Sequence, residues 1–169
     1  MIRRCAFVVL AAMLALSLSA QEPGRVVPSI KFAPVGRVQL KPGESKNVEL
    51  DFRIANEFHV NSHKPHSELL IPTSLNIPVS QMFKSKTSVG VASVQYPAGE
   101  DMSFPFAPDE KLSVYSGDFS ITAVVKASPE ATVGDYPISG ELRFQACDRS
   151  ACYPPRAIPV KFTVSVTGK

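Results

Sequence analysis

Tyr136-Pro-Ile-Ser-Gly-Glu-Leu-Arg-Phe144 is the stretch of sequence that decides the fold. Apolar or small residues alternate along it with other side chains, and a similar alternation resumes from Ile158 to Val166. A period of two places alternate side chains on opposite faces of a β-strand. The two runs therefore predict a pair of strands, each with one face in a hydrophobic core.

The same pattern recurs in the rest of the chain. Clear alternation covers Val48–Ile54 and Phe119–Val125, and weaker candidates cover Val35–Leu40, Leu69–Ile77 and Val89–Tyr96. Fifteen prolines and nine glycines punctuate these short runs, and no window shows a helical stripe. Seven or eight short strands predict an all-β fold, an immunoglobulin-like antiparallel β-sandwich. The chain has no tryptophan, so aliphatic and phenylalanine side chains must fill the core.

One segment, Pro97–Leu112, breaks the alternation and is predicted to form a long loop. It carries Phe104, Pro105 and Phe106 at its tip. Exposed aromatic side chains need either a core or a partner to cover them.

The N-terminus has the layout of a secretory signal peptide. A basic start with Arg3 and Arg4 precedes an apolar run from Ala6 to Leu18, and small residues end at Ala20. The apolar run is shorter than the roughly 20 residues that a spanning helix needs. We therefore expect a signal peptide at 1–20, a flexible leader at 21–34 and one exported domain at 35–169, without a transmembrane segment after cleavage.

The charge balance argues against polyanionic partners. Loss of Arg3 and Arg4 would reduce the 18 lysine and arginine residues to 16, against 15 acidic residues. A near-neutral chain has no electrostatic basis for binding nucleic acid or an anionic membrane surface.

Two of the three cysteines, Cys147 and Cys152, lie between the alternating runs Tyr136–Phe144 and Ile158–Val166. If they face each other across a hairpin with a four-residue loop, a disulfide fits without rearrangement. Closing a loop of about six residues contributes only roughly 2 kcal/mol on the chain-entropy model. A small structural disulfide and a redox-active pair are both consistent with this spacing.

Metal binding is a third reading of the cysteine pair. Two thiolates leave a tetrahedral site half filled, and the histidines that could complete it, His59, His63 and His66, lie far upstream. Copper(I) held by two thiolates stays open as an alternative. We expect no cofactor and no resident metal.

The run Arg143-Phe-Gln-Ala-Cys-Asp-Arg-Ser-Ala-Cys-Tyr-Pro-Pro155 resembles the active-site hairpin of the N-terminal periplasmic domain of the thiol:disulfide interchange protein DsbD. The family pattern is an aromatic-Gln-x-Cys, a short loop and then Cys-x-Pro-Pro. Two upstream blocks are also similar to the family: Glu57–Pro65 with Ile71–Leu75, and Gln95–Gly99 followed by Leu112–Gly117.

The resemblance implies an immunoglobulin-like domain that is located in the periplasm and relays reducing equivalents there between thioredoxin-like proteins. Cys152 would form mixed disulfides and Cys147 would resolve them. Thioredoxin-like periplasmic proteins or a membrane electron carrier would be the partners, acting in trans. The alternatives are a non-catalytic periplasmic binding module with a structural hairpin disulfide, or a copper(I)-handling domain.

The resemblance also places four further residues near the cysteines. His59 and Asn61 match positions that could tune the thiol pKa or orient a partner. The local alternation instead predicts that Phe58 and Val60 face the core while His59 and Asn61 face solvent. Phe104 and Phe106 are candidates either for an aromatic cap over the disulfide or for core residues that anchor their loop.

Overall fold

The computed structural model describes residues 28–84 and 88–168, and within these residues the fold is all-β with one short 3-10 turn at Val79–Gln81. The predicted immunoglobulin-like antiparallel sandwich is confirmed. In the described part of the chain, no helix is long and apolar enough to cross a membrane. The predicted signal peptide, residues 1–20, lies outside the described residues.

The first sheet has four antiparallel strands. Its order is β1 (Ile30–Phe32), β3 (Ser45–Ile54), β9 (Asp118–Ala127) and β6 (Val89–Gln95). The β3 and β9 strands form the long central pair, with Leu50 opposite Ile121 and Phe52 opposite Phe119. Their inward residues are those that the alternation predicted, because every second side chain meets the same core.

The second sheet contains the strands around the cysteine hairpin. Its order is β2 (Val38–Leu40), β12 (Arg156–Val166), β10 (Gly134–Phe144) and β5 (Ser74–Asn76). β10 and β12 pair antiparallel from Gly134↔Val166 to Phe144↔Arg156, whereas β2 runs parallel to β12. The predicted hairpin of the two alternating runs is therefore present.

One hydrophobic core draws residues from both of these sheets. The most deeply buried large side chains include Phe52, Phe144, Leu50, Ile121 and Leu142. Phe52 and Phe119 stack with ring centroids 5.2 Å apart. Aliphatic and phenylalanine packing thus fills the sandwich, as the absence of tryptophan required.

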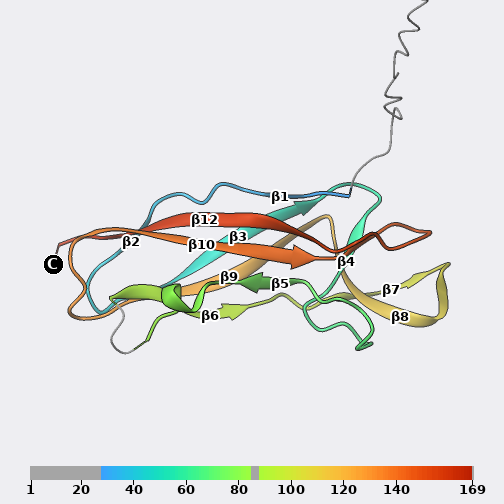
Figure 1. The fold of residues 1–169 in the computed structure, drawn as a ribbon, viewed down its shortest axis with the longest axis horizontal. Coiled ribbons are helices and arrows are strands. Elements are labelled where there is room, and N and C mark those ends of the chain that lie inside the picture. The colour runs from blue at the N-terminus through green and yellow to red at the C-terminus, as the bar shows by residue number, and fades with distance from the viewer. Residues whose placement is uncertain (1–27, 85–87, 169) are drawn as a thin grey trace, which may run out of the picture.

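A third, smaller sheet lies at one end of the molecule. Its order is β11 (Ala146–Cys147), β4 (His59–Asn61), β8 (Ala107–Ser116) and β7 (Glu100–Phe104). Figure 1 shows the β7–β8 hairpin and the loop between β10 and β12 at the same end, opposite the C-terminus. This end carries both cysteines.

Two boundaries predicted from the sequence need correction. Strand β1 pairs with β3 and buries Ile30, so ordered structure begins inside the range 21–34 that was assigned to a flexible leader. The segment Pro97–Leu112 is not a long loop, because it forms β7 and the first part of β8, up to Leu112. Strand β7 exposes every side chain except Phe104, and β8 exposes Pro108–Lys111, so the usual alternation is absent from this hairpin.

Candidate functional site

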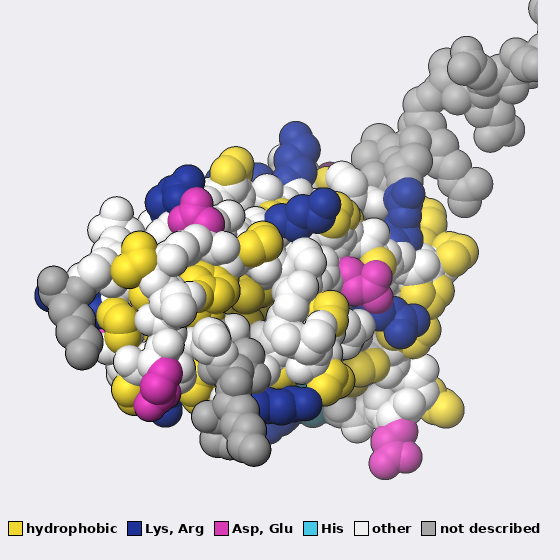
Figure 2. All heavy atoms as spheres, turned by 60° about the vertical axis from the view of Figure 1, so that its left-hand side comes forward, with side chains coloured by type: hydrophobic (Ala, Val, Ile, Leu, Met, Phe, Trp, Pro, Cys, Tyr) yellow, Lys and Arg dark blue, Asp and Glu magenta, His cyan; other side chains and the backbone are white. Residues whose placement is uncertain are grey.

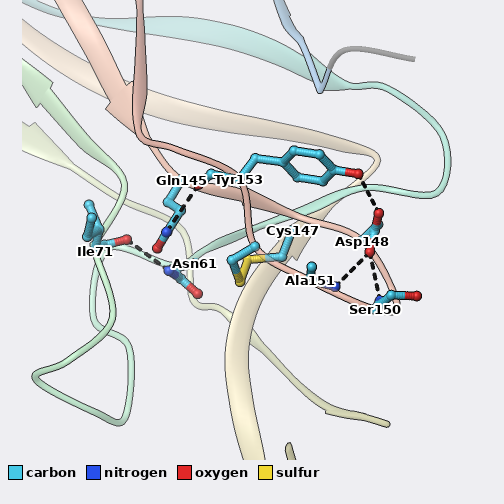
Figure 3. Close-up of a disulfide and its surroundings, with 9 residues drawn as sticks. Asn61, Ile71, Gln145, Cys147, Asp148, Ser150, Ala151 and Tyr153 are labelled. Carbon is cyan, nitrogen blue, oxygen red and sulfur yellow. Dashed lines mark hydrogen bonds between the residues drawn. A yellow bond between two sulfur atoms is a disulfide. The ribbon is translucent and has the colours of Figure 1, made fainter. Parts of the chain in front are cut away.

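The centre of the candidate site is a disulfide between Cys147 and Cys152, with the Cα atoms 3.9 Å apart (Figure 3). The Asp148 amide donates to the Ala151 carbonyl, and the Tyr153 amide donates to the Ala146 carbonyl. The cysteines therefore form the non-hydrogen-bonded pair between two backbone hydrogen bonds, which is the closer type of antiparallel pair. Asp148 to Ala151 form the expected four-residue loop.

The two sulfur-bearing residues differ sharply in exposure. Cys147 is 0% exposed, whereas Cys152 is exposed. Strand β11 places Cys147 against β4, while Pro154 and Pro155 follow Cys152 and offer no amide hydrogen to a neighbouring strand. Cys152 is therefore the more accessible of the two residues, as predicted from the sequence.

The Asp148 carboxylate holds the loop in shape. Its Oδ1 accepts hydrogen bonds from the amides of Ser150 and Ala151, at 2.7 and 2.9 Å, and its Oδ2 accepts one from the Tyr153 hydroxyl at 2.6 Å. The Tyr153 hydroxyl and then the two amides hold the pKa of Asp148 below its ordinary value. This carboxylate is thus ionised at neutral pH next to Cys147.

Two further contacts fix the exit of the hairpin. The Gln145 amide nitrogen donates to the Tyr153 carbonyl at 3.2 Å, and the Tyr153 ring meets Phe58 edge-on at 5.8 Å. Sequence reasoning missed both Gln145 and Tyr153 as supporting residues. Their positions inside the Gln-x-Cys and Cys-x-Pro-Pro patterns were the available signal.

His59 lies directly across from Cys147. The two residues pair in the β4–β11 register, so their side chains project from the same face of the third sheet. His59 is 4% exposed and Asn61 is 0% exposed. The expectation that these two residues face solvent was wrong, because strand β4 is covered on both faces.

Phe104 and Phe106 reach the site through His59. The Phe104 ring stacks on the imidazole at 3.9 Å, and the Phe106 ring lies parallel to it at 6.4 Å. Phe104 is buried with Leu112 and Val114 in a second hydrophobic cluster, whereas Phe106 is 37% exposed. Phe104 therefore packs directly on the imidazole, and Phe106 stacks on Phe104 at 5.4 Å.

Two buried polar atoms beside the disulfide have no hydrogen-bond partner: His59 Nε2 and Asn61 Oδ1. The Asn61 amide nitrogen does donate to the Ile71 carbonyl at 3.0 Å (Figure 3). Burial lowers the pKa of His59 from 6.5 to about 4, although the Asp148 carboxylate acts in the opposite direction. His59 is therefore neutral at pH 7.

His63 and His66, which the sequence offered as further metal ligands, make other contacts. Among residues 28–84 and 88–168, no three His, Cys, Asp or Glu side chains are grouped so that they could hold an ion. His63 instead stacks on Tyr96 at 3.6 Å, and His66 pairs with Asp101 at 2.7 Å. Figure 2 shows basic and acidic side chains interspersed on one face of the molecule.

These features define a class of protein: an immunoglobulin-like β-sandwich that carries an asymmetrically exposed disulfide on a terminal hairpin. The chain belongs to the family described as "Thiol:disulfide interchange protein DsbD, N-terminal", which matches residues 29–163. Thiol–disulfide exchange is the chemistry of this family.

Solved structures with similarity to the chain include two from Neisseria meningitidis. The DsbD N-terminal domain in its reduced form is 22% identical, with 81% of this chain and 86% of that chain covered and a TM-score of 0.42. The complex between the DsbD N-terminal and PilB N-terminal domains gives 20% identity, 69% and 73% coverage and a TM-score of 0.38. AggA, the major subunit of aggregative adherence fimbriae type I from Escherichia coli, gives 7% identity, 83% and 95% coverage and a TM-score of 0.33. No curated protein matches the chain significantly.

Proposed function

We propose that this domain relays reducing equivalents between thioredoxin-like proteins in the periplasm, by reversible opening of the Cys147–Cys152 disulfide. The observation that carries the proposal is the asymmetry of the pair, with Cys147 buried and Cys152 exposed. An exchange protein needs one sulfur that a partner can attack and a second that releases the partner afterwards. Membership of a thiol:disulfide interchange family supports the same function.

In the reducing step, a thiolate of the donor attacks the Cys152 sulfur and forms a mixed disulfide, and Cys147 leaves as a thiolate that takes up a proton. The second thiolate of the donor then attacks the donor sulfur of the mixed disulfide, the bond to Cys152 breaks, and Cys152 leaves as a thiolate. The donor leaves as a disulfide, and two electrons remain on Cys147 and Cys152.

In the oxidising step, the Cys152 thiolate attacks the disulfide of an acceptor protein. Cys147 then attacks Cys152, closes the internal disulfide and expels the acceptor in its reduced form. Cys152 is thus the exchanging residue and Cys147 the resolving residue.

Trapping experiments with single-cysteine variants test this assignment. Cys147→Ser should accumulate a mixed disulfide between Cys152 and a thioredoxin-like partner, because no resolving thiol remains to release it. Cys152→Ser should trap far less, since its remaining thiol is buried. Non-reducing electrophoresis followed by mass spectrometry of the linked peptides measures both products.

Two results would contradict the proposal. Equal trapping by both variants would remove the distinction between the cysteines. Trapping by neither variant, together with a reduction potential of the wild-type pair well below about −300 mV, would indicate a structural disulfide in a binding module.

A further inference from the structure

The further inference concerns the unpartnered nitrogen of His59. A buried polar atom without a hydrogen bond costs roughly 1–3 kcal/mol, so such an atom in a well-packed site requires an explanation. His59 Nε2 is such an atom, on a side chain that is only 4% exposed. The same side chain lies across the strand pair from Cys147, on the same face of the sheet.

In the oxidised protein, Cys147 has no hydrogen to donate, because its sulfur is bonded to Cys152. Reduction converts it into a buried thiol. The thiol brings the hydrogen-bond donor that the imidazole lacks, and it appears only in the reduced state.

We propose that His59 is the internal base of the resolving step: its Nε2 accepts the hydrogen bond of the reduced Cys147 thiol and takes its proton when Cys147 closes the disulfide. This inference rests on the proposed exchange function and assigns a proton acceptor to it. His59 would act on the resolving cysteine and leave the exposed Cys152 to solvent and the partner.

Closure of the disulfide transfers one proton and exchanges one sulfur–sulfur bond for another. The Cys147 S–H proton moves to His59 Nε2 while the Cys147 sulfur forms a bond to the Cys152 sulfur. The bond between Cys152 and the acceptor breaks, and the acceptor sulfur leaves with the electron pair as a thiolate. The imidazolium then returns its proton to solvent.

The groups around His59 suit this role. Its β11 neighbour is Cys147, with the ionised Asp148 next in sequence, and its β8 neighbour is Ser116, whose hydroxyl donates to Glu100 at 3.5 Å. Phe104 of β7 covers the imidazole face at 3.9 Å. The aromatic cover keeps the ring neutral at rest, and the Asp148 carboxylate stabilises the imidazolium that forms during the step.

In the part of the chain that the structure describes, Asn61 Oδ1 is the second buried side-chain atom without a partner. An amide oxygen can accept a hydrogen bond, but it does not take up a proton at neutral pH. Of the two orphaned atoms, only the imidazole nitrogen can serve as a base.

Stopped-flow kinetics with an aromatic disulfide reagent that releases a coloured thiol separate the two steps. The reduced protein should release a first equivalent at a rate that depends on reagent concentration, as Cys152 attacks. It should release a second equivalent at a concentration-independent rate, as Cys147 resolves the mixed disulfide. The second phase is absent from Cys147→Ser and serves as the assay.

His59→Phe keeps the ring that stacks on Phe104 and removes both nitrogens. We expect an unchanged first phase and a second phase slower by about 10²-fold, the lower end of the range for general base catalysis. The pH profile should change as well. The wild-type second phase should stay nearly flat at neutral pH and decline only as His59 becomes protonated near its pKa of about 4, whereas the variant rate should rise about tenfold per pH unit until the Cys147 thiol ionises.

His63→Phe is the matched control, because His63 also stacks on an aromatic ring but is not paired with a cysteine. It should leave both phases unchanged. His59→Ala gives a second, independent readout: added imidazole should restore the second phase, and pyrrole, which has the same ring size but no basic nitrogen, should not.

A second phase of wild-type rate and pH profile in His59→Phe would overturn the inference while leaving the exchange function standing. Equal rescue of His59→Ala by imidazole and pyrrole would also overturn it, since cavity filling alone would then suffice. Absence of the second phase from the wild-type protein would instead remove the exchange function itself.

Discussion

At the scale of single residues, the cysteines were predictable and their neighbours were not. The short spacing, the flanking strands and the two prolines after Cys152 indicated a hairpin with one accessible sulfur. His59 and Asn61 were placed on the wrong side of the strand because alternation assumes that one face of a strand meets water. Strand β4 has a core residue, Val60, on one face and the Phe104 ring over His59 on the other.

Because His59 is buried as a neutral imidazole, we expect the free energy of unfolding to depend on pH. With a pKa of about 4 in the folded protein and 6.5 in the unfolded chain, the unfolded chain binds the proton first as the pH falls. The free energy of unfolding should therefore decrease between pH 6.5 and about 4, by about 3 kcal/mol, since each pKa unit corresponds to about 1.4 kcal/mol. Denaturant unfolding of the oxidised protein across this range measures the loss.

His59→Phe should lack this decrease, since it has no proton to bind at that position. The carboxylates whose pKa lies below its ordinary value, Asp118, Asp135 and Asp148, lose their contribution only at lower pH, below about 4. A decrease of the same size in the variant and the wild type would contradict the burial of a neutral imidazole.

At the scale of strands, the sequence predicted the long central pairs well and the third sheet poorly. β3, β9, β10 and β12 each bury one face against the common core, so their residues alternate. The β7–β8 hairpin projects from the end of the sandwich and exposes Glu100, Asp101, Pro105 and Asp109. Charged residues and proline are common where a strand edge meets solvent. They give this hairpin the composition of a loop, and so the sequence pattern did not indicate its strands.

Gly99, which directly precedes β7, packs closely against Ser62 and Ser113. A Cβ atom added there would collide with the Ser113 hydroxyl of β8 and would lie 2.7 Å from Ser62 Cβ, next to β4. The Ser62 and Ser113 hydroxyls already hydrogen-bond to each other at 2.9 Å, so neither can move freely. Gly99→Ala should lower the free energy of unfolding by about 1–3 kcal/mol, the usual cost of overpacking.

Gly36→Ala is the control for that experiment, because nothing lies within 4 Å of the atom it adds. It should be neutral or slightly stabilising, since alanine restricts the unfolded chain more than glycine does. Thermal or chemical unfolding of both variants gives the comparison. Gly99→Ala with the stability of Gly36→Ala would mean that β7 is not held closely against Ser62 and Ser113.

At the scale of the whole molecule, the reactive pair and the main core occupy different places. The large core side chains lie between the first two sheets, and the disulfide lies on the third sheet at one end of the sandwich (Figure 1). The β10–β12 ladder, which leads into the cysteine loop, carries eleven register pairs from Gly134↔Val166 to Phe144↔Arg156. The fold therefore does not depend on the bond that the proposed chemistry breaks.

Reduction of the disulfide should accordingly lower the free energy of unfolding by no more than about 2 kcal/mol, the loop-entropy value for about six residues. Leu142→Ala, a truncation in the fully buried part of β10, should cost about 2–5 kcal/mol with the disulfide intact. Urea unfolding with and without reductant compares the two. A larger loss on reduction than on truncation would give the disulfide a structural role.

The five-residue separation of Cys147 and Cys152 has a consequence for biosynthesis. Strand β2 can take its place in the sheet only after β12 has been synthesised, because Val38 pairs with Val164. The sandwich therefore closes only after β12 has been made. The two cysteines can pair earlier, since the short loop between them brings them together even in an unfolded chain. Within residues 28–168, no other cysteine competes for either thiol, so oxidation before folding can join only these two there.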